Sequence, residues 1–232
     1  MNHHPPASPA TLLRTLQVSR TPSPRVLRAV SGFGLAITRR SAAHAADQRR
    51  RKSLALLLDA RLKPGEIAFL SGPSGCGKSR LLSAWRRLLP GSITCRPVPP
   101  TIAAIDALPA PLPAALDALS RAGLADAQLL PRLGAELSGG EAARLSLAIA
   151  ITRAQRRLRQ AKAATIFADE FLTPLDRPTA HAIAMSLAPW TRRTGVRLIC
   201  AAANDDLAPF LRPNLWIRLL DEPHAPAREI SA

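Results

Sequence analysis

The chain is poor in aromatic residues, in cysteine and in long apolar runs. Its 232 residues include no tyrosine, three tryptophans and five phenylalanines, and so few aromatic side chains argue against an aromatic-rich β-sandwich. Three cysteines, an odd and small number, provide no disulfide framework, so we expect a reducing compartment, the cytoplasm. No stretch approaches the roughly 20 consecutive apolar residues of a membrane-spanning helix, and we expect no transmembrane segment.

Acidic residues are scarce in the first part of the chain. Residues 1–65 contain 12 lysines and arginines against two acids, Asp47 and Asp59, so that +10 of the net charge of +16 lies there. Such an excess favours a polyanionic partner, and nucleic acid bound through the basic N-terminal third is one hypothesis. The preference for arginine, 28 against four lysines, is also typical of a GC-rich genome, and the composition leaves both explanations open.

Proline and charge suggest the domain boundaries. Residues 1–24 hold five of the 22 prolines and no acid, which predicts a disordered basic arm with at most a short helix around residues 12–18. Residues 25–222 are expected to form the folded domain. Residues 223–232 are expected to form a C-terminal tail.

Apolar runs alternate with helical patterns along the folded domain. Helices are predicted at residues 78–89, 139–160 and 178–190, and a turn at residues 63–66. Strands that alternate with helices imply an α/β fold, with a mostly parallel sheet flanked by helices. The predicted strands are residues 33–38, 54–62, 67–71, 92–98, 165–168, 197–202 and 215–220.

A glycine-rich loop follows the apolar strand 67–71 and precedes a helical pattern. It matches the phosphate-binding pattern G-x-x-x-x-G-K-[ST], in which backbone N–H groups and a helix N-terminus surround phosphate groups. Lys78 is expected to reach the β- and γ-phosphates of a nucleotide, and the Ser79 hydroxyl to ligate Mg²⁺. The loop consists of Gly72, Pro73, Ser74, Gly75, Cys76, Gly77, Lys78 and Ser79.

A second candidate element is the apolar run Thr165–Ala168, which ends in two carboxylates. Because the carboxyl ends of parallel strands meet at one edge of a sheet, Asp169 is expected beside the phosphate loop, where it can hold Mg²⁺. Glu170 is then placed to polarise an attacking water as a general base.

The third element is Leu137-Ser138-Gly139-Gly140-Glu141, two glycines at the start of a helix. Together with the phosphate loop, the strand ending in Asp169-Glu170 and the following Leu175-Asp176, it resembles the ATP-binding-cassette (ABC) ATPase superfamily over residues 54–220. The resemblance implies that residues 25–222 are an ABC-type ATPase domain with a P-loop NTPase fold, which binds and hydrolyses ATP with Mg²⁺.

The resemblance also implies a head-to-tail homodimer that closes on two ATP molecules and relaxes on hydrolysis. Ser138, Gly139 and Gly140 of one subunit would contact the γ-phosphate held by the other. Asp176 would couple the two sites across the interface.

The sequence departs from the ABC pattern in the interval after the phosphate loop. Only 57 residues separate Ser79 from Leu137, which implies a shortened helical subdomain and argues against a membrane partner. No glutamine follows the predicted strand 92–98, and Thr94 or Thr101 is a candidate substitute.

Two further departures concern the nucleotide itself. Asn204 stands where the family has its switch histidine, and because an amide cannot become charged, we expect slow hydrolysis. No tyrosine is available to stack on adenine, which leaves Phe33, His44 or an arginine within residues 49–51 as candidates.

A narrower resemblance and two alternatives remain open. Residues 169–180, 33–35 and 211–215 are similar to a soluble group of ABC-type ATPases that are sometimes fused to a predicted acetyltransferase. The alternatives are an ABC transporter subunit and a nucleotide-dependent DNA-binding module with little hydrolysis. The basic segment 153–162 could track a phosphate backbone, although a solvated helix end is the simpler interpretation.

Overall fold

The computed structural model describes residues 15–18, 22–32, 36–39, 42–219 and 228–230. The chain divides into two units, residues 1–50 and 51–232. In the first unit, β1 (Thr15–Val18) pairs in parallel with β2 (Ala36–Arg39), and α1 (Pro24–Gly32) lies between them in the chain. The expected helix at 12–18 is therefore wrong for Thr15–Val18. The rest of the predicted disordered arm lies mostly outside the described residues, and its disorder stays a prediction.

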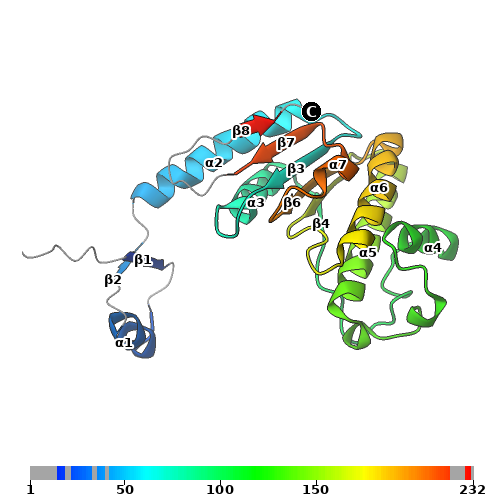
Figure 1. The fold of residues 1–232 in the computed structure, drawn as a ribbon, viewed down its shortest axis with the longest axis horizontal. Helices are drawn as coiled ribbons and strands as arrows, with labels where there is room; N and C mark the ends of the chain where they lie inside the picture. Colours follow the sequence, from blue (N-terminus) through cyan, green and yellow to red (C-terminus); the bar gives the residue numbers. More distant parts are fainter. Residues whose placement is uncertain (1–14, 19–21, 33–35, 40–41, 220–227, 231–232) are drawn as a thin grey trace, which may run out of the picture. The chain divides into compact units, whose positions relative to one another are not determined.

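The second unit is built on a six-stranded sheet of order β4-β5-β6-β3-β7-β8 (Figure 1). The strands from β4 to β7 in this order run parallel, and β8 pairs antiparallel with β7. The predicted α/β fold with a mostly parallel sheet is confirmed. The strands are β3 (Ile67–Ser71), β4 (Ile93–Thr94), β5 (Thr165–Ala168), β6 (Arg197–Ala202), β7 (Leu215–Arg218) and β8 (Arg228–Ile230), the last within the stretch expected as a tail.

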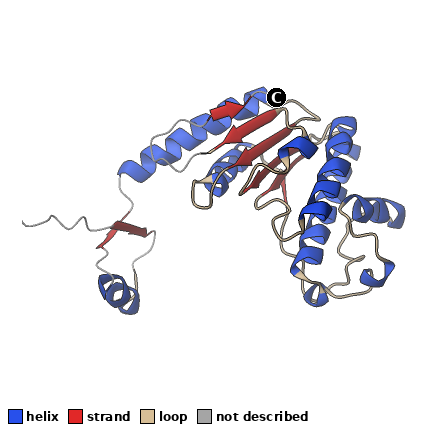
Figure 2. Ribbon diagram, viewed as in Figure 1, coloured by secondary structure: helices blue, strands red, loops and turns tan. Residues whose placement is uncertain are grey.

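Helices cover both faces of this sheet (Figure 2). Side chains alternate along a strand, so Phe69 points into a core with α4, α5 and α6, while its neighbour Leu70 points into a core with α2 and α3. Each face therefore has its own apolar cluster. The helices are α2 (Ala42–Arg61), α3 (Lys78–Leu88), α4 (Leu112–Arg121), α5 (Gly139–Arg159), α6 (Arg177–Thr194) and the short α7 (Ala208–Leu211).

The predicted strand at residues 54–62 is wrong, because these residues form the end of α2. Ala55, Leu58 and Leu62 are buried, whereas Leu56 and Leu57 are exposed. That spacing of three and four residues is helical. The short apolar run at residues 54–58 suits either a buried strand or a buried helix, and packing in the same apolar cluster as Trp85 of α3 favours the helix.

The stretch between β4 and α5 is short and only partly helical. The expected strand at 92–98 is reduced to Ile93–Thr94, since the prolines at 97, 99 and 100 have no N–H for a sheet ladder. Beyond it lie α4 and two turns of 3₁₀ helix, Ala127–Leu129 and Gly134–Glu136. Of the helices described, none combines the length and the apolar character needed to cross a membrane.

Candidate functional site

The predicted phosphate loop joins β3 to α3, as the sequence implied. Its shape requires glycine: a Cβ on Gly72 would lie 2.1 Å from the backbone oxygen of Leu219. Gly75 and Gly77 have φ angles of 88° and 101°, in the left-handed region that side chains disfavour. The loop therefore has the backbone that its sequence pattern predicts.

The loop and the first turn of helix α3 carry N–H groups and an ammonium group that suit an anion. Helix α3 is capped by Gly77 without any side-chain hydrogen bond, so N–H groups of its first turn lack a side-chain acceptor. Lys78 Nζ donates to the backbone oxygens of Gly72 (2.6 Å) and Pro73 (2.8 Å) and lies 3.9 Å from Cys76 Sγ. An anion at this helix start gains the aligned N–H groups, the helix dipole and the ammonium charge.

A cavity of about 510 Å³ opens beside the loop. Its volume falls within the usual range of small-molecule sites. Both carboxylates predicted from the end of β5, Asp169 and Glu170, reach it. The lining residues are Ser74, Gly75, Gly77, Lys78, Ser79, Arg80, Asp169, Glu170, Thr173, Ala202 and Ala203.

Glu170 is held in an unusual backbone conformation. Its φ is 49°, in the left-handed region, and Leu172 has a φ of 58°. Two hydrogen bonds maintain the turn: Glu170 N–H donates to Asp169 Oδ1 at 3.1 Å, and Phe171 N–H donates to the Ala201 carbonyl at 2.7 Å. Strain of this kind concentrates at functional sites, which agrees with the general-base role expected for Glu170.

Two oxygen donors that suit Mg²⁺ line this cavity. The Ser79 hydroxyl and the Asp169 carboxylate line the same cavity, and hard cations prefer such oxygens. No group of three His, Cys, Asp or Glu that could hold a metal occurs among the described residues. The donor set therefore suits Mg²⁺ that takes its remaining ligands from phosphate and water.

An adjoining cavity of about 300 Å³ is lined by one of the two threonines that could replace the glutamine of the ABC pattern. Thr94, at the end of β4, lines it together with Ser79 and Asp169. Its Oγ1 accepts from Arg96 Nε at 3.2 Å. The alternative, Thr101, lines neither this cavity nor the one at the phosphate loop.

The predicted signature forms the N-terminus of α5. Ser138 caps the helix: its Oγ accepts from Glu141 N–H at 3.3 Å, and Glu141 Oε2 accepts from Ser138 N–H at 2.7 Å. These hydrogen bonds with Ser138 lower the pKa of Glu141. None of Ser138, Gly139 and Gly140 lines the cavity at the phosphate loop of the same chain.

The two signature glycines differ in why they are glycine. A Cβ on Gly140 would lie 3.1 Å from Leu175 Cδ2, so packing within the chain explains its small size. A Cβ on Gly139 would meet no atom within 4 Å. The monomer therefore leaves room for a side chain at Gly139.

Asp176 caps helix α6. Its side chain accepts from Thr179 N–H at 3.0 Å, and this hydrogen bond lowers the pKa of Asp176. The contact gives Asp176 a role in its own helix, while the expected coupling role across an interface stays a prediction.

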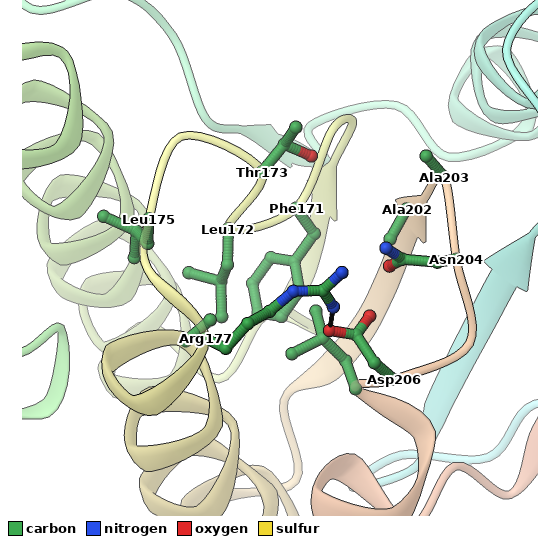
Figure 3. A pocket seen from close by; sticks show the side chains of 11 residues that line it. Phe171, Leu172, Thr173, Leu175, Arg177, Ala202, Ala203, Asn204 and Asp206 are labelled. Carbon is green, nitrogen blue, oxygen red and sulfur yellow. Dashed lines mark ion pairs between the residues drawn. The ribbon is translucent and has the colours of Figure 1, made fainter.

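Asn204 lies in a neighbouring small cavity of about 110 Å³ (Figure 3). With the amide nitrogen facing Asp206, Asn204 donates to that carboxylate and accepts from Arg177 Nη2 at 2.9 Å. Arg177 and Asp206 form an ion pair. Ala202 and Ala203 line both this cavity and the one at the phosphate loop, whereas Asn204 lines only the former.

Sequence reasoning missed three polar residues near the loop. Arg177 and Asp206 hold Asn204, and Arg80 lines the phosphate-loop cavity. The polar run Asn204-Asp205-Asp206, one residue after the end of β6, is the available signal, because polar residues at strand ends often reach a site. Of the adenine candidates, Arg51 Nη1 donates to the Gly77 carbonyl at 3.2 Å. Phe33 and the side chain of His44 fall outside the described residues.

Comparisons with known proteins agree with this geometry. The profile of the AAA ATPase domain family matches residues 48–217. No curated protein matches the sequence.

Among solved structures, the chain resembles the dimeric ABC transporter cassette MJ0796, with a TM-score of 0.55 and 21% identity over 73% of this chain and 87% of that one. The ADP- and phosphate-bound dimer of that cassette gives a TM-score of 0.54 with the same identity and coverage. A bacterial Atm1-family ABC exporter with ATP bound matches at a TM-score of 0.54 and 16% identity, over 72% of this chain and 34% of that one. The fold implied by the ABC resemblance is thus confirmed.

Proposed function

Since this chain belongs to the AAA ATPase domain family, we propose that it hydrolyses MgATP and uses ATP to close a head-to-tail homodimer as a conformational switch. The observation that carries the proposal is the division of the site. The phosphate loop and both carboxylates share one cavity, while Ser138, Gly139 and Gly140 lie outside it with open space at Gly139. A second copy of the chain can supply these residues.

ATP binding rests on the loop and on α3. Backbone N–H groups of the loop bind the phosphates, and Lys78 exchanges the Gly72 and Pro73 carbonyls for β- and γ-phosphate oxygens. Mg²⁺, held by Ser79 and Asp169, supplies charge neutralisation of the phosphates when bound. Cys76 and the other loop residues provide backbone rather than side-chain contacts.

Hydrolysis rests on Glu170. Its carboxylate accepts a proton from the attacking water as the water bonds to the γ-phosphorus and ADP leaves. Asn204 is held by Arg177 and Asp206 and cannot become a cation. We therefore expect slow turnover.

The first experiment is the light-scattering mass of purified Glu170→Gln protein with and without MgATP. This substitution removes the base and leaves the phosphate loop intact, so ATP should trap the closed state. A monomer of 24.8 kDa is expected to become a dimer of about 50 kDa, since a closed two-fold dimer contains two copies. An unchanged mass, with ATP binding shown separately, would contradict the switch.

A matched control uses the open space at Gly139. Glu170→Gln combined with Gly139→Asp places a carboxylate at the start of α5, where it suits the helix dipole and where the added Cβ meets no atom of the chain within 4 Å. We expect unchanged folding and ATP binding but no dimer, because the new charge faces the partner's γ-phosphate. Dimer formation by this variant would show that the signature does not contact ATP.

The transporter-subunit alternative is supported by one observation. The interval between β4 and α5 exposes large apolar side chains: 60% of Leu112 and 42% of Leu116 on α4, 41% of Leu133 and 40% of Ile102. Such side chains suit a protein partner. Co-purification of the chain with a membrane protein that is lost in Leu112→Ser/Leu116→Ser would support this alternative over the homodimer alone.

The cytoplasm is the compartment that the thiols support. Cys76, Cys95 and Cys200 are all free. Burial raises the pKa of Cys95 to about 12 and also raises that of Cys200. Both thiols are therefore protonated and unreactive at neutral pH.

A further inference from the structure

The ends of the helices in the second unit carry a concentration of positive charge. In a parallel sheet the connecting helices run antiparallel to the strands. Their C-termini therefore gather at the amino ends of the strands, opposite the phosphate loop. The last turns of α3, α5 and α6 all contain arginines there. We call this the basic edge; its residues are Lys63, Arg87, Arg156, Arg157, Arg159, Lys162, Arg192 and Arg193. Arg86, although in the last turn of α3, lines the cavity of Thr94, Ser79 and Asp169 and is not counted here.

Contacts between distant segments show that these charges belong to one surface. A Cβ on Gly91, in the turn after α3, would lie 2.6 Å from Arg157 Nη1 of α5. A Cβ on Gly65, in the turn before β3, would lie 3.2 Å from the Arg192 backbone oxygen of α6. A cavity of about 290 Å³ is lined jointly by the turn before β3, the end of α5 and the end of α6: Pro64, Leu158, Ala161, Lys162, Ala163, Ala164, Gly195 and Arg197.

The basic edge has almost no compensating acid. Residues 78–105 and 142–168, which contain α3 and most of α5, include no aspartate or glutamate. The nearby carboxylates are already engaged: Asp59 accepts from Arg197 at 3.0 Å and Trp85 Nε1 at 3.0 Å, and Glu66 accepts from Lys63 N–H at 2.7 Å.

Four of these side chains are free to meet an anion. Arg87, Arg156, Arg159 and Lys162 are exposed, and among the described residues no carboxylate pairs with them. Arg157 and Arg192 donate to the backbone carbonyls of Ala163 and Arg212. Basic residues in a last turn complement the helix dipole, but that effect needs only a fraction of a charge. Two or three arginines in each of three adjacent last turns exceed it.

We propose that the basic edge binds the phosphate backbone of double-stranded DNA. Arginine is the side chain best suited to phosphate oxygens, through paired N–H donors. An anionic membrane would favour apolar anchors as well, and none of the exposed large apolar side chains of the described residues belongs to this edge. Single strands are bound through stacked aromatic rings, which the basic edge lacks. The surface therefore recognises the charge of the phosphate backbone and has no specificity for the base sequence.

The test is fluorescence anisotropy of a labelled 30-base-pair duplex without nucleotide, from 50 to 300 mM salt. Arg156→Ala/Arg159→Ala should weaken binding about tenfold and reduce the salt slope by about two, and Arg87→Ala should weaken it about threefold and reduce the slope by about one. Arg121→Ala/Arg132→Ala removes the same charge from the interval between β4 and α5 and should bind like the wild type. An unchanged Tm of the α5 variant checks its folding.

Other outcomes overturn the proposal. Loss of duplex binding in Arg25→Ala/Arg28→Ala but not in the α5 variant would assign the DNA to the N-terminal third. Equal loss in the Arg121→Ala/Arg132→Ala control would show a general charge effect. Tighter binding to vesicles containing phosphatidylserine, or to a single strand, than to the duplex would assign the edge to that partner. Because nucleotide is omitted, each result is independent of the proposed ATP switch.

Discussion

Lys78 is held in place by the backbone of its own loop. Its ammonium has three donors, and two of them are satisfied by the Gly72 and Pro73 carbonyls. A phosphate must compete with these carbonyls, but its full negative charge attracts the ammonium more strongly than a carbonyl dipole does. The lysine is therefore held in place for phosphate rather than buried away from it.

Substitutions of Glu170 can separate the effect of its backbone strain on stability from the effect of its carboxylate on hydrolysis. Its φ of 49° costs a non-glycine residue about 1–2 kcal/mol, which glycine avoids. We expect Glu170→Gly to have a free energy of unfolding about 1 kcal/mol above that of Glu170→Gln, since glutamine keeps the strain and glycine's greater freedom in the unfolded chain offsets part of the gain. Both variants should be inactive. Denaturant titration measures the difference, and equal stabilities would mean that the turn is not strained.

Asn204 should limit the rate of hydrolysis. In Asn204→His the imidazole would lie beside Asp206, and a nearby carboxylate favours the charged imidazolium. We expect turnover of MgATP to rise by about tenfold, because a positioned acid–base group contributes at least that much. Asn204→Gln, which keeps an amide, serves as the control. A rate that stays the same or falls in Asn204→His would contradict the role given to Asn204.

At the scale of elements, helix ends determine how the site is presented. Helix α3 begins at Gly77 without a side-chain cap, which leaves its N–H groups for an anion. Helices α5 and α6 begin with their own caps, Ser138 and Asp176. The capped ends can therefore approach a partner without unsatisfied backbone groups.

Asp176 can be tested for two roles at once. Asp176→Ala removes the cap of α6 and should lower Tm by about 2–4 °C, whereas Asp176→Asn keeps a good capping residue. The pKa of Asp176 is lowered in the folded state, so its cap contributes above the ordinary carboxyl pKa and is lost as pH falls through the lowered value. If Asp176 couples the two ATP sites, Asp176→Asn retains Tm at pH 7 but loses cooperativity in ATP. Unchanged cooperativity would leave Asp176 as a cap alone.

The sequence predicts helices and strands correctly where the spacing of apolar residues agrees with the turn-forming residues at the ends of the element. Helices α3, α5 and α6 and strands β3, β5 and β6 were expected within a few residues of their bounds. The failure at 54–62 came from the apolar run at residues 54–58, which is too short to distinguish a helical period from that of a buried strand. At β1 and β2, pairing between the two strands, rather than local preference, accounts for Thr15–Val18 being a strand.

At the scale of the whole molecule, the parallel sheet would separate the two proposed activities. The carboxyl ends of β3 and β5 present the phosphate loop, Asp169 and Glu170. The opposite edge gathers the helix C-termini with their arginines. Closure on ATP and contact with DNA would therefore use opposite ends of the strands of one sheet.

The head-to-tail dimer predicts complementation between two inactive variants. Lys78→Met lacks a working phosphate loop, and Gly139→Asp lacks a working signature. A mixed dimer has one site with both defects and one with neither, so an equal mixture with independent sites should recover about a quarter of wild-type turnover. Each variant alone should be inactive. A mixture as inactive as its components would mean that each site is completed within one chain.

The sequence by itself determined the local chemistry. The spacing of Gly72, Gly77, Lys78 and Ser79, and an apolar strand that ends in Asp169, define a phosphate and Mg²⁺ site because each depends on neighbouring residues of one short segment. Only the tertiary structure decided which distant groups share a space. It placed Thr94 in one cavity with Ser79 and Asp169, put Asn204 beside Arg177 and Asp206, and brought the arginines of three helices to one edge. Contacts between residues that are distant in the sequence depend on the order and direction of the strands, which no local sequence pattern determines.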